Sequence, residues 1–268
     1  MSAVERALML LEHLASVEQD SIADICRVLP LQPSSAHRIL GELIRLGYVR
    51  QRGSQGHYSL TIKLSSLGLT HLAARGITDI AQPILDELAH EVCELVRFSV
   101  VEGDDLIWIA KSQGAKAGLR YDPDPDMGLK VNLGATASGL ARLLTLTDNE
   151  AVMLLGRQGV EFPLKGFGSA APTSIDEFLQ VLGRCRSVGY GFVHDSYEDG
   201  TSAMAMPVVK ARSAEVIGVI SIAGPSVRMT AARMTAMALP LRAATEQLAE
   251  IGAGLSFANS AGFETLDA

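Results

Sequence analysis

The chain has 268 residues, of which 48% are hydrophobic, and its 23 basic and 30 acidic side chains give a net charge of −7. This length allows one large domain or two modest ones with packed cores. No run of about 18 apolar residues occurs, so we expect no membrane-spanning segment. Ser2 and Glu5 fit a capping box at the start of a first helix rather than a secretion signal, and we expect a cytoplasmic protein.

The first sixty residues have the pattern of three short helices followed by a hairpin. In the first helix, the spacing predicts a buried face formed by Val4, Ala7, Leu8, Leu11, Leu14 and Ala15. Ser21 suits the N-cap of a second helix, Pro30 ends that helix, and Pro33 suits the first turn of a third. A stop at Gly47 precedes two short strands around Gly53. This order is that of a winged helix-turn-helix, whose usual partner is the major groove of DNA.

The third helix carries the candidate DNA-reading residues. Its predicted buried stripe consists of Ile39, Leu40, Leu43 and Leu46. The opposite face and the wing supply the side chains that we expect nearest the duplex, namely Ser34, Ser35, His37, Arg38, Arg45, Arg50 and Arg52. An ordinary solvated helix would also have a polar face, so local charge decides between the two readings. Residues 30–75 have a net charge of +5, against −9 for residues 76–268, which favours DNA contact by one end of the chain.

The chain divides near residue 75. We expect a DNA-binding domain over residues 1–60, a linker helix over 61–76 that packs partly on its own copy in a dimer, a sensor domain over 77–254 and a flexible tail over 255–268. Strands are predicted on both sides of a hairpin at 103–105 and at 191–194, 202–209 and 216–223. Helices are predicted at 77–92, 138–146, 149–155, 174–188 and 231–251, the last interrupted at Pro240. Helices mixed with an antiparallel sheet make an α+β domain.

The cysteines and acidic clusters do not indicate a bound metal. Cys26, Cys93 and Cys185 are odd in number and widely separated, which matches neither a disulfide framework nor a zinc pattern. Cys26 and Cys93 lie in apolar helical contexts and are interpreted as core residues, with redox sensing as the alternative. The DPDPD run lacks the spacing and the glycine of a calcium loop. We expect no metal and no cofactor.

Several segments between residues 2 and 254 resemble the IclR family of bacterial transcriptional regulators. They are AVERALMLLEHLA, SSAHRILGELIRLGYV, HYSLTIKLSSLG, LGATASGLARLL, GYGFVHDSYEDGTSAMAMPV and GVISIAGPSVRMT, in this order. The resemblance implies a winged helix-turn-helix joined by a helix to a GAF-like α+β effector-binding domain. It also implies dimers or tetramers on palindromic operators, and a small organic acid or an aromatic or sugar-acid catabolite as the ligand. We therefore expect a ligand-responsive repressor of a catabolic operon.

The resemblance also places an effector pocket in the second domain. It implies that backbone amides at the start of the LGATASGLARLL helix, those of Ala137 and Ser138, hold a carboxylate, which agrees with the preference of helix starts for anions. The other positions that it implies are Val193, Asp195, Ala203, Ser221 and Ala223. Some relatives carry an acidic residue where this chain has Val193 and a cysteine where it has Ala203, and a second hydroxyl can occur at the position of Ala223. Fewer polar anchors suggest a larger or more apolar ligand.

The residues themselves add further candidates. Arg120 lies in GLRYDPDPDMG, a loop that we expect to cover the site, where it could bind a carboxylate or form a surface ion pair with Asp122 or Asp124. Trp108 and Met127 are either ligand contacts or core residues.

Two other classes of function stay open. A hydrolase would need a nucleophile and a base, and His194 and Ser196 share one side of a predicted strand. However, no G-x-S-x-G elbow and no phosphate loop occurs, so we expect no enzyme. The second alternative is a regulator whose sensor domain binds a protein partner rather than a metabolite.

Overall fold

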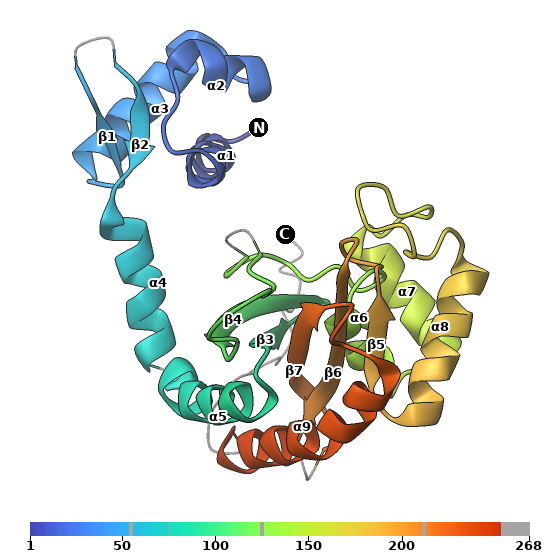
Figure 1. Cartoon of the computed structure of the whole chain (residues 1–268). Coiled ribbons are helices and arrows are strands. Elements are labelled where there is room, and N and C mark those ends of the chain that lie inside the picture. Colours follow the sequence, from blue (N-terminus) through green and yellow to red (C-terminus); the bar gives the residue numbers. More distant parts are fainter. Residues whose placement is uncertain (54–55, 75, 124–125, 211–212, 253–268) are drawn as a thin grey trace. The chain divides into compact units, whose positions relative to one another are not determined.

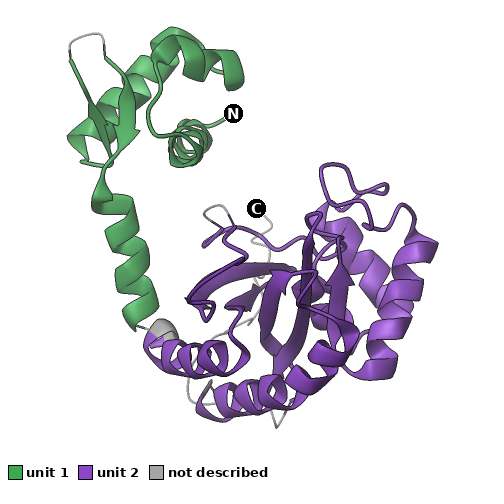
Figure 2. Ribbon diagram, viewed as in Figure 1, with its two compact units in different colours: residues 1–74 green, residues 75–268 purple. Residues whose placement is uncertain are grey.

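The computed structural model describes residues 1–53, 56–74, 76–123, 126–210 and 213–252. The chain divides into two compact units, Met1–Ala74 and Arg75–Ala268 (Figure 2). Each unit has a hydrophobic core of its own. The tail expected over 255–268 lies outside the described residues.

The first unit is a helix-turn-helix followed by a short hairpin and one more helix. Its described elements are α1 (Ala3–Ser16), α2 (Ile22–Val28), α3 (Pro33–Arg45), β1 (Val49–Gln51), β2 (Tyr58–Leu60) and α4 (Ile62–Ala74) (Figure 1). The capping box is present, because the Ser2 hydroxyl accepts from the Glu5 amide and the Glu5 carboxylate accepts from the Ser2 amide. Ser21 caps α2 by accepting from the amide of Asp24, and Pro33 occupies the first turn of α3. β1 and β2 pair antiparallel and form the wing.

The predicted buried face of α1 is wrong in part. Leu10 and Leu14 are the fully buried side chains of this helix, whereas Val4, Leu8 and Ala15 are exposed. The contact that decides this is the one between α1 and α3, which the periodicity of α1 alone does not reveal. The stripe predicted for α3 is confirmed at Ile39, Leu40 and Leu43, while Leu46, at the C-cap, is exposed.

Helix α4 has no buried residue. It nevertheless carries the large exposed apolar side chains of Ile62, Leu64, Leu67 and Leu69. A helix with apolar side chains around most of its surface is usually covered by another part of a protein. In the single chain, the apolar side chains of α4 therefore remain exposed to solvent, although they are of the kind that is usually buried.

The second unit is a five-stranded antiparallel sheet between helices. Its described elements are α5 (Ile77–Val92), β3 (Leu95–Glu102), β4 (Asp105–Gln113), α6 (Ala137–Leu143), α7 (Asp148–Gln158), α8 (Ile175–Val188), β5 (Gly191–His194), β6 (Thr201–Val209), β7 (Val216–Pro225) and α9 (Ala231–Gly252). The strand order is β4-β3-β7-β6-β5, and every neighbouring pair is antiparallel. The α+β class and the hairpin at 103–105 are confirmed.

Helices cover both faces of this sheet (Figure 1). α5 and α9 pack together against one face, and α6 packs against the other, with α8 beside it. The core on the α6 side joins residues of α6, α7 and α8 to Trp108, Val193, Ala205 and Val219 of the strands. Because side chains alternate along a strand, the positions on β5, β6 and β7 that face α6 lie at every second residue.

Two further expectations need correction. α9 is one continuous helix through Pro240, not an interrupted one. Cys93 is exposed rather than buried, because it is the C-cap of α5 and has a left-handed backbone with φ of 54°. Cys185 is buried and Cys26 partly buried.

Candidate DNA-reading face and effector cavity

The exposed face of α3 presents most of the predicted DNA-reading residues. Ser34, His37 and Arg38 are exposed, and Arg38 has no ion-pair partner among the described residues. A side chain at Gly41 would meet nothing within 4 Å, so this position leaves the surface open for close approach. Arg45 is exposed and bonds the Glu42 carboxylate of its own helix at 2.8 Å.

The other predicted DNA contacts are partly engaged within the unit. Ser35 is half-buried and accepts a hydrogen bond of 2.9 Å from Arg6 of α1, which ties the two helices together. On the wing, Arg50 donates to the Ser59 hydroxyl at 3.1 Å, while Arg52 is exposed. Arg38 and Arg52 are therefore the predicted DNA-contact arginines that are exposed and have no side-chain partner among the described residues.

A cavity of about 20 Å³ lies between α6 and the sheet of the second unit. Six of the ten predicted effector residues line it: Ala137, Ser138, Val193, Ala203, Ser221 and Ala223. The cross-strand register explains the gathering, because Ala203 pairs with both Val193 and Ala223. The remaining lining residues are Arg97, Tyr121, Thr136, Tyr197, Thr201 and Ser202.

The start of α6 contributes backbone donors to this cavity. Thr136 is the N-cap, and its hydroxyl accepts from the amide of Gly139 at 2.9 Å. No described group accepts from the amides of Ala137 and Ser138, the first two of the helix. Gly139 is required here, since a Cβ would lie 2.3 Å from the Leu133 backbone. The close contact holds the start of α6 in place at the cavity.

Arg97 of β3 was not identified from the sequence. Its guanidinium lines the cavity, and its Nη1 lies 2.6 Å from Oδ2 of Asp126, with both side chains less than a tenth exposed. The guanidinium carbon lies 4.5 Å from the centre of the Trp108 ring, a cation–π distance. A usable signal existed, since an arginine within the apolar run LVRFSVV must be buried with a partner if the strand is covered on both faces.

A buried tyrosine, Tyr121, and a half-buried one, Tyr197, lie near the same arginine. The Tyr121 ring centre lies 5.9 Å from the guanidinium carbon, and burial raises the pKa of this phenol, so it stays protonated. Burial likewise raises the pKa of Tyr197, whose ring meets Trp108 edge to face at 6.1 Å. Trp108 is thus part of the core and at the same time the surface on which Arg97 lies.

Four predicted effector residues are absent from the cavity lining, namely Trp108, which is part of the core, and Arg120, Met127 and Asp195. Arg120 is exposed and ion-paired with Asp122 at 2.7 Å, the surface alternative expected for it. Met127 is partly exposed and does not line the cavity. The Asp195 carboxylate accepts from the Gly200 amide and from the Ser226 hydroxyl, which stabilises the turn between β5 and β6.

The polar groups near His194 do not form a catalytic triad. Ser196 donates to the carbonyl of Ala135 at 3.0 Å and is not bonded to His194. His194 instead bonds Ser202, which bonds Ser226, which donates to Asp195. The acid is therefore two hydroxyls away from the imidazole, whereas a triad needs the acid on the imidazole itself.

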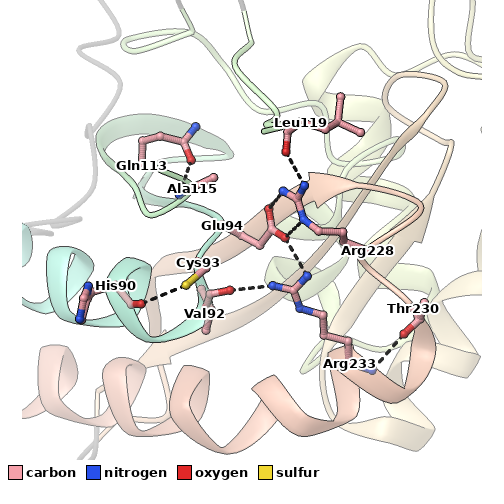
Figure 3. A network of polar contacts seen from close by, with 10 residues as sticks. All are labelled: His90, Val92, Cys93, Glu94, Gln113, Ala115, Leu119, Arg228, Thr230 and Arg233. Carbon is pink, nitrogen blue, oxygen red and sulfur yellow. Dashed lines mark hydrogen bonds and ion pairs between the residues drawn. The ribbon is translucent and has the colours of Figure 1, made fainter. Parts of the chain in front are cut away.

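A second cavity, of about 330 Å³, lies beside a buried carboxylate at the end of α5. Glu94 is 1% exposed and forms ion pairs with Arg228 and Arg233 (Figure 3). Nη1 of Arg228 also donates to the carbonyl of Leu119, and Nη2 of Arg233 to that of Val92. These contacts join the end of α5 to α9 and a loop, and we interpret the cluster as a structural clamp.

No set of three or more metal-ligating side chains is grouped among the described residues. In the same part of the chain, no helix is long and apolar enough to span a membrane.

Comparisons with known proteins identify the family. Residues 69–250 match the model of the C-terminal domain of bacterial transcriptional regulator IclR, and residues 3–53 match the IclR helix-turn-helix model. The chain belongs to the IclR family. It is a transcriptional regulator rather than an enzyme.

The chain is similar over most of its length to members of this family from different bacteria. The transcriptional repressor IclR of Escherichia coli K12 is 28% identical over 92% of this chain and 88% of its own length. An IclR regulator from Alicyclobacillus acidocaldarius has the same fold, with a TM-score of 0.77 at 20% identity, covering 92% of this chain and 97% of that chain. An IclR homologue from Microbacterium hydrocarbonoxydans, solved with 4-hydroxybenzoate, has a TM-score of 0.73 at 20% identity, covering 93% of this chain and 98% of that chain.

Proposed function

We propose that this regulator is a repressor of a catabolic operon and that a small carboxylic acid, bound in the cavity beside α6, controls it. The observation that carries the proposal is the pairing of a buried cation, Arg97, with two free amides at Ala137 and Ser138 around one cavity. A cation and helix-start amides both favour an anion. The relative solved with 4-hydroxybenzoate holds a ligand of this chemical class.

The cavity is small, so the acid must be compact or the walls must move. About 20 Å³ is close to the ~10–15 Å³ that one water requires. Valine at 193 and alanines at 203 and 223 make much of the wall apolar. An aromatic monocarboxylate fits this site if the side chains of the wall rearrange. Its ring would pack on the apolar walls, and its carboxylate would pair with Arg97.

We propose that two copies act together on a palindromic DNA site. Ser34, His37 and Arg38 of α3 would contact the major groove, and Arg52 the phosphate backbone, with Ser35, Arg45 and Arg50 beside them. The exposed apolar side chains of α4 supply a surface for self-association. The acid would alter DNA affinity by binding one arrangement of the dimer more tightly than another.

Thermal melting with a panel of aromatic acids, sugar acids and small keto acids tests the effector. A ligand that binds only the folded state raises the melting temperature with dose, so we expect one class of acid to do so. DNA sites selected from a random library should then be released when that acid is added. If no acid shifts melting while DNA binding persists, the second unit responds to a protein partner instead.

A further inference from the structure

Two cations face each other across β3 and β4, next to the effector cavity. Arg97 and Lys111 are direct cross-strand partners in the antiparallel register. Like charges at such positions destabilise a sheet. The Asp126 carboxylate lies between them, with Oδ2 at 2.6 Å from Arg97 and Oδ1 at 3.7 Å from Lys111.

This group of three charges has an excess of one positive charge, and Arg97 is the member that lines the cavity. Arg97 and Lys111 together carry two positive charges, and Asp126 neutralises one of them. Lys111, with a side chain 37% exposed, and exposed Glu198, the acidic neighbour of Tyr121, are both screened by solvent more strongly than the buried pair of Arg97 and Asp126. Arg97, the cation that lines the cavity, therefore suits a single carboxylate in place of that of Asp126.

Several buried polar atoms at this place have no hydrogen-bond partner among the described residues. They are Nε of Arg97, Nε1 of Trp108, Oη of Tyr121, Oδ1 of Asp126 and Oγ of Ser221. Native proteins satisfy most buried polar atoms, so each of these calls for an explanation. The two nitrogens can only donate, which favours a ligand rich in acceptors, such as a carboxylate.

The size of the cavity decides how such a ligand can reach Arg97. A volume of about 20 Å³ is too small for a carboxylate unless the neighbouring side chains move. Arg97 lines the cavity while its Nη1 is held by Asp126, which does not line it, so a carboxylate that binds this guanidinium must compete with Asp126 for it.

We propose that Arg97 anchors the carboxylate of the effector and that Asp126 is an internal competitor, paired with Arg97 while no effector is bound. The exchange replaces one carboxylate by another, so Arg97 is paired in both states, and the displaced Asp126 still has Lys111 as an ion-pair partner. The ion pair between Asp126 and Arg97 is therefore present without the effector and broken when the effector is bound. The inference rests on the proposed effector function and names the anion-binding residue and its competitor.

Chemical rescue tests the exchange without knowing the natural effector. In Asp126→Ala, sodium acetate should raise the melting temperature with dose, whereas acetamide and sodium chloride at equal ionic strength should not. We expect the acetate dissociation constant to be at least about tenfold lower than for the natural chain, the effect of removing one buried competing charge. If the alanine variant folds poorly, Asp126→Asn removes the competing charge but keeps the side-chain volume, and acetate should still stabilise it more than the natural chain, though less than it stabilises the alanine variant.

Two further variants make the result specific. Asp122→Ala removes an exposed acid of the same loop, paired only with exposed Arg120, and should respond to acetate as the natural chain does. Arg97→Gln combined with Asp126→Ala should lose the rescue. Equal responses to acetate and acetamide, or equal responses in Asp126→Ala and Asp122→Ala, would overturn the proposal.

The outcomes also separate this inference from the effector proposal. Rescue by acetate, with no acid of the panel acting on the natural chain, would support the Arg97 anchor and remove the acid effector. An acid that stabilises the natural chain and Arg97→Gln equally would leave the effector in place and reject Arg97 as its anchor.

Discussion

Both carboxylate oxygens of Glu94 accept hydrogen bonds from Arg228, with Nε and Nη2 each at 2.8 Å (Figure 3). The contact joins residues 134 positions apart, and Arg233 of α9 adds a second cation to the same carboxylate. Because Glu94 follows α5 directly, one buried side chain ties the end of that helix to the start of α9.

We expect Glu94→Gln to lower the free energy of unfolding of the second unit. Removing one partner of a buried ion pair costs about 3–5 kcal/mol, and the arginines are about a third exposed, so we expect about 2–3 kcal/mol. Urea denaturation monitored by circular dichroism measures the change. Glu91→Gln, an exposed position on α5, is the control and should be neutral; equal stability of the two variants would show that the clamp contributes little.

Arg38→Ala should weaken binding to selected DNA sites by about 1–3 kcal/mol and relax the preference at one base position. Fluorescence anisotropy with site variants measures both effects. Arg27→Ala removes an exposed arginine on α2 that is paired with Asp24, and it should leave base preference unchanged. Uniform weakening by Arg38→Ala on every sequence would make this residue a phosphate contact.

Ser221→Ala should weaken the response to the acid found in the melting panel, because its buried hydroxyl lines the cavity without a partner in the described chain. The DNA affinity of the ligand-free protein should not change. Ser187→Ala, on the exposed side of α8, is the matched control. A response to the acid as strong as that of the natural chain would remove Ser221 from the site.

Cys93 should react with iodoacetamide in the folded protein at pH 8, whereas Cys185 should not. Cys93 is exposed, while burial raises the pKa of the Cys185 thiol to about 11 and keeps it protonated. Mass spectrometry of the labelled peptides distinguishes the two sites. The unfolded thiol ionises near 9, so the contribution of Cys185 to stability is complete below pH 9 and declines as the pH rises towards 11. Rapid native labelling of Cys185 would contradict its burial.

Ile62→Glu combined with Leu69→Glu should shift the protein towards monomers, because both side chains are exposed, apolar and two helical turns apart on α4. Light scattering coupled to gel filtration measures the mass. Thr70→Glu adds a charge at an exposed position of the same helix and serves as the control. An unchanged oligomer in the double variant would place the contact between copies elsewhere.

The sequence by itself determined the elements and their order. Ser21, Pro33 and the glycine after α3 act on the backbone next to them, so local chemistry reveals where these helices begin and end. The hairpin at 103–105 and the alternation along β5 and β6 are local for the same reason. Ala137, Ser138 and Ser221 were placed at one pocket by resemblance to a family, not by their own spacing.

Only the tertiary structure decided which faces meet and which charges pair. Leu10 rather than Leu8 is buried because α1 packs on α3, and a helical repeat leaves that direction open. Arg97 and Asp126 are 29 residues apart, and no periodicity connects them. Arg97 is buried because β3 is covered on both faces, and a buried cation is stable only when it is paired with an acid. Asp126, in the segment after β4, is that acid.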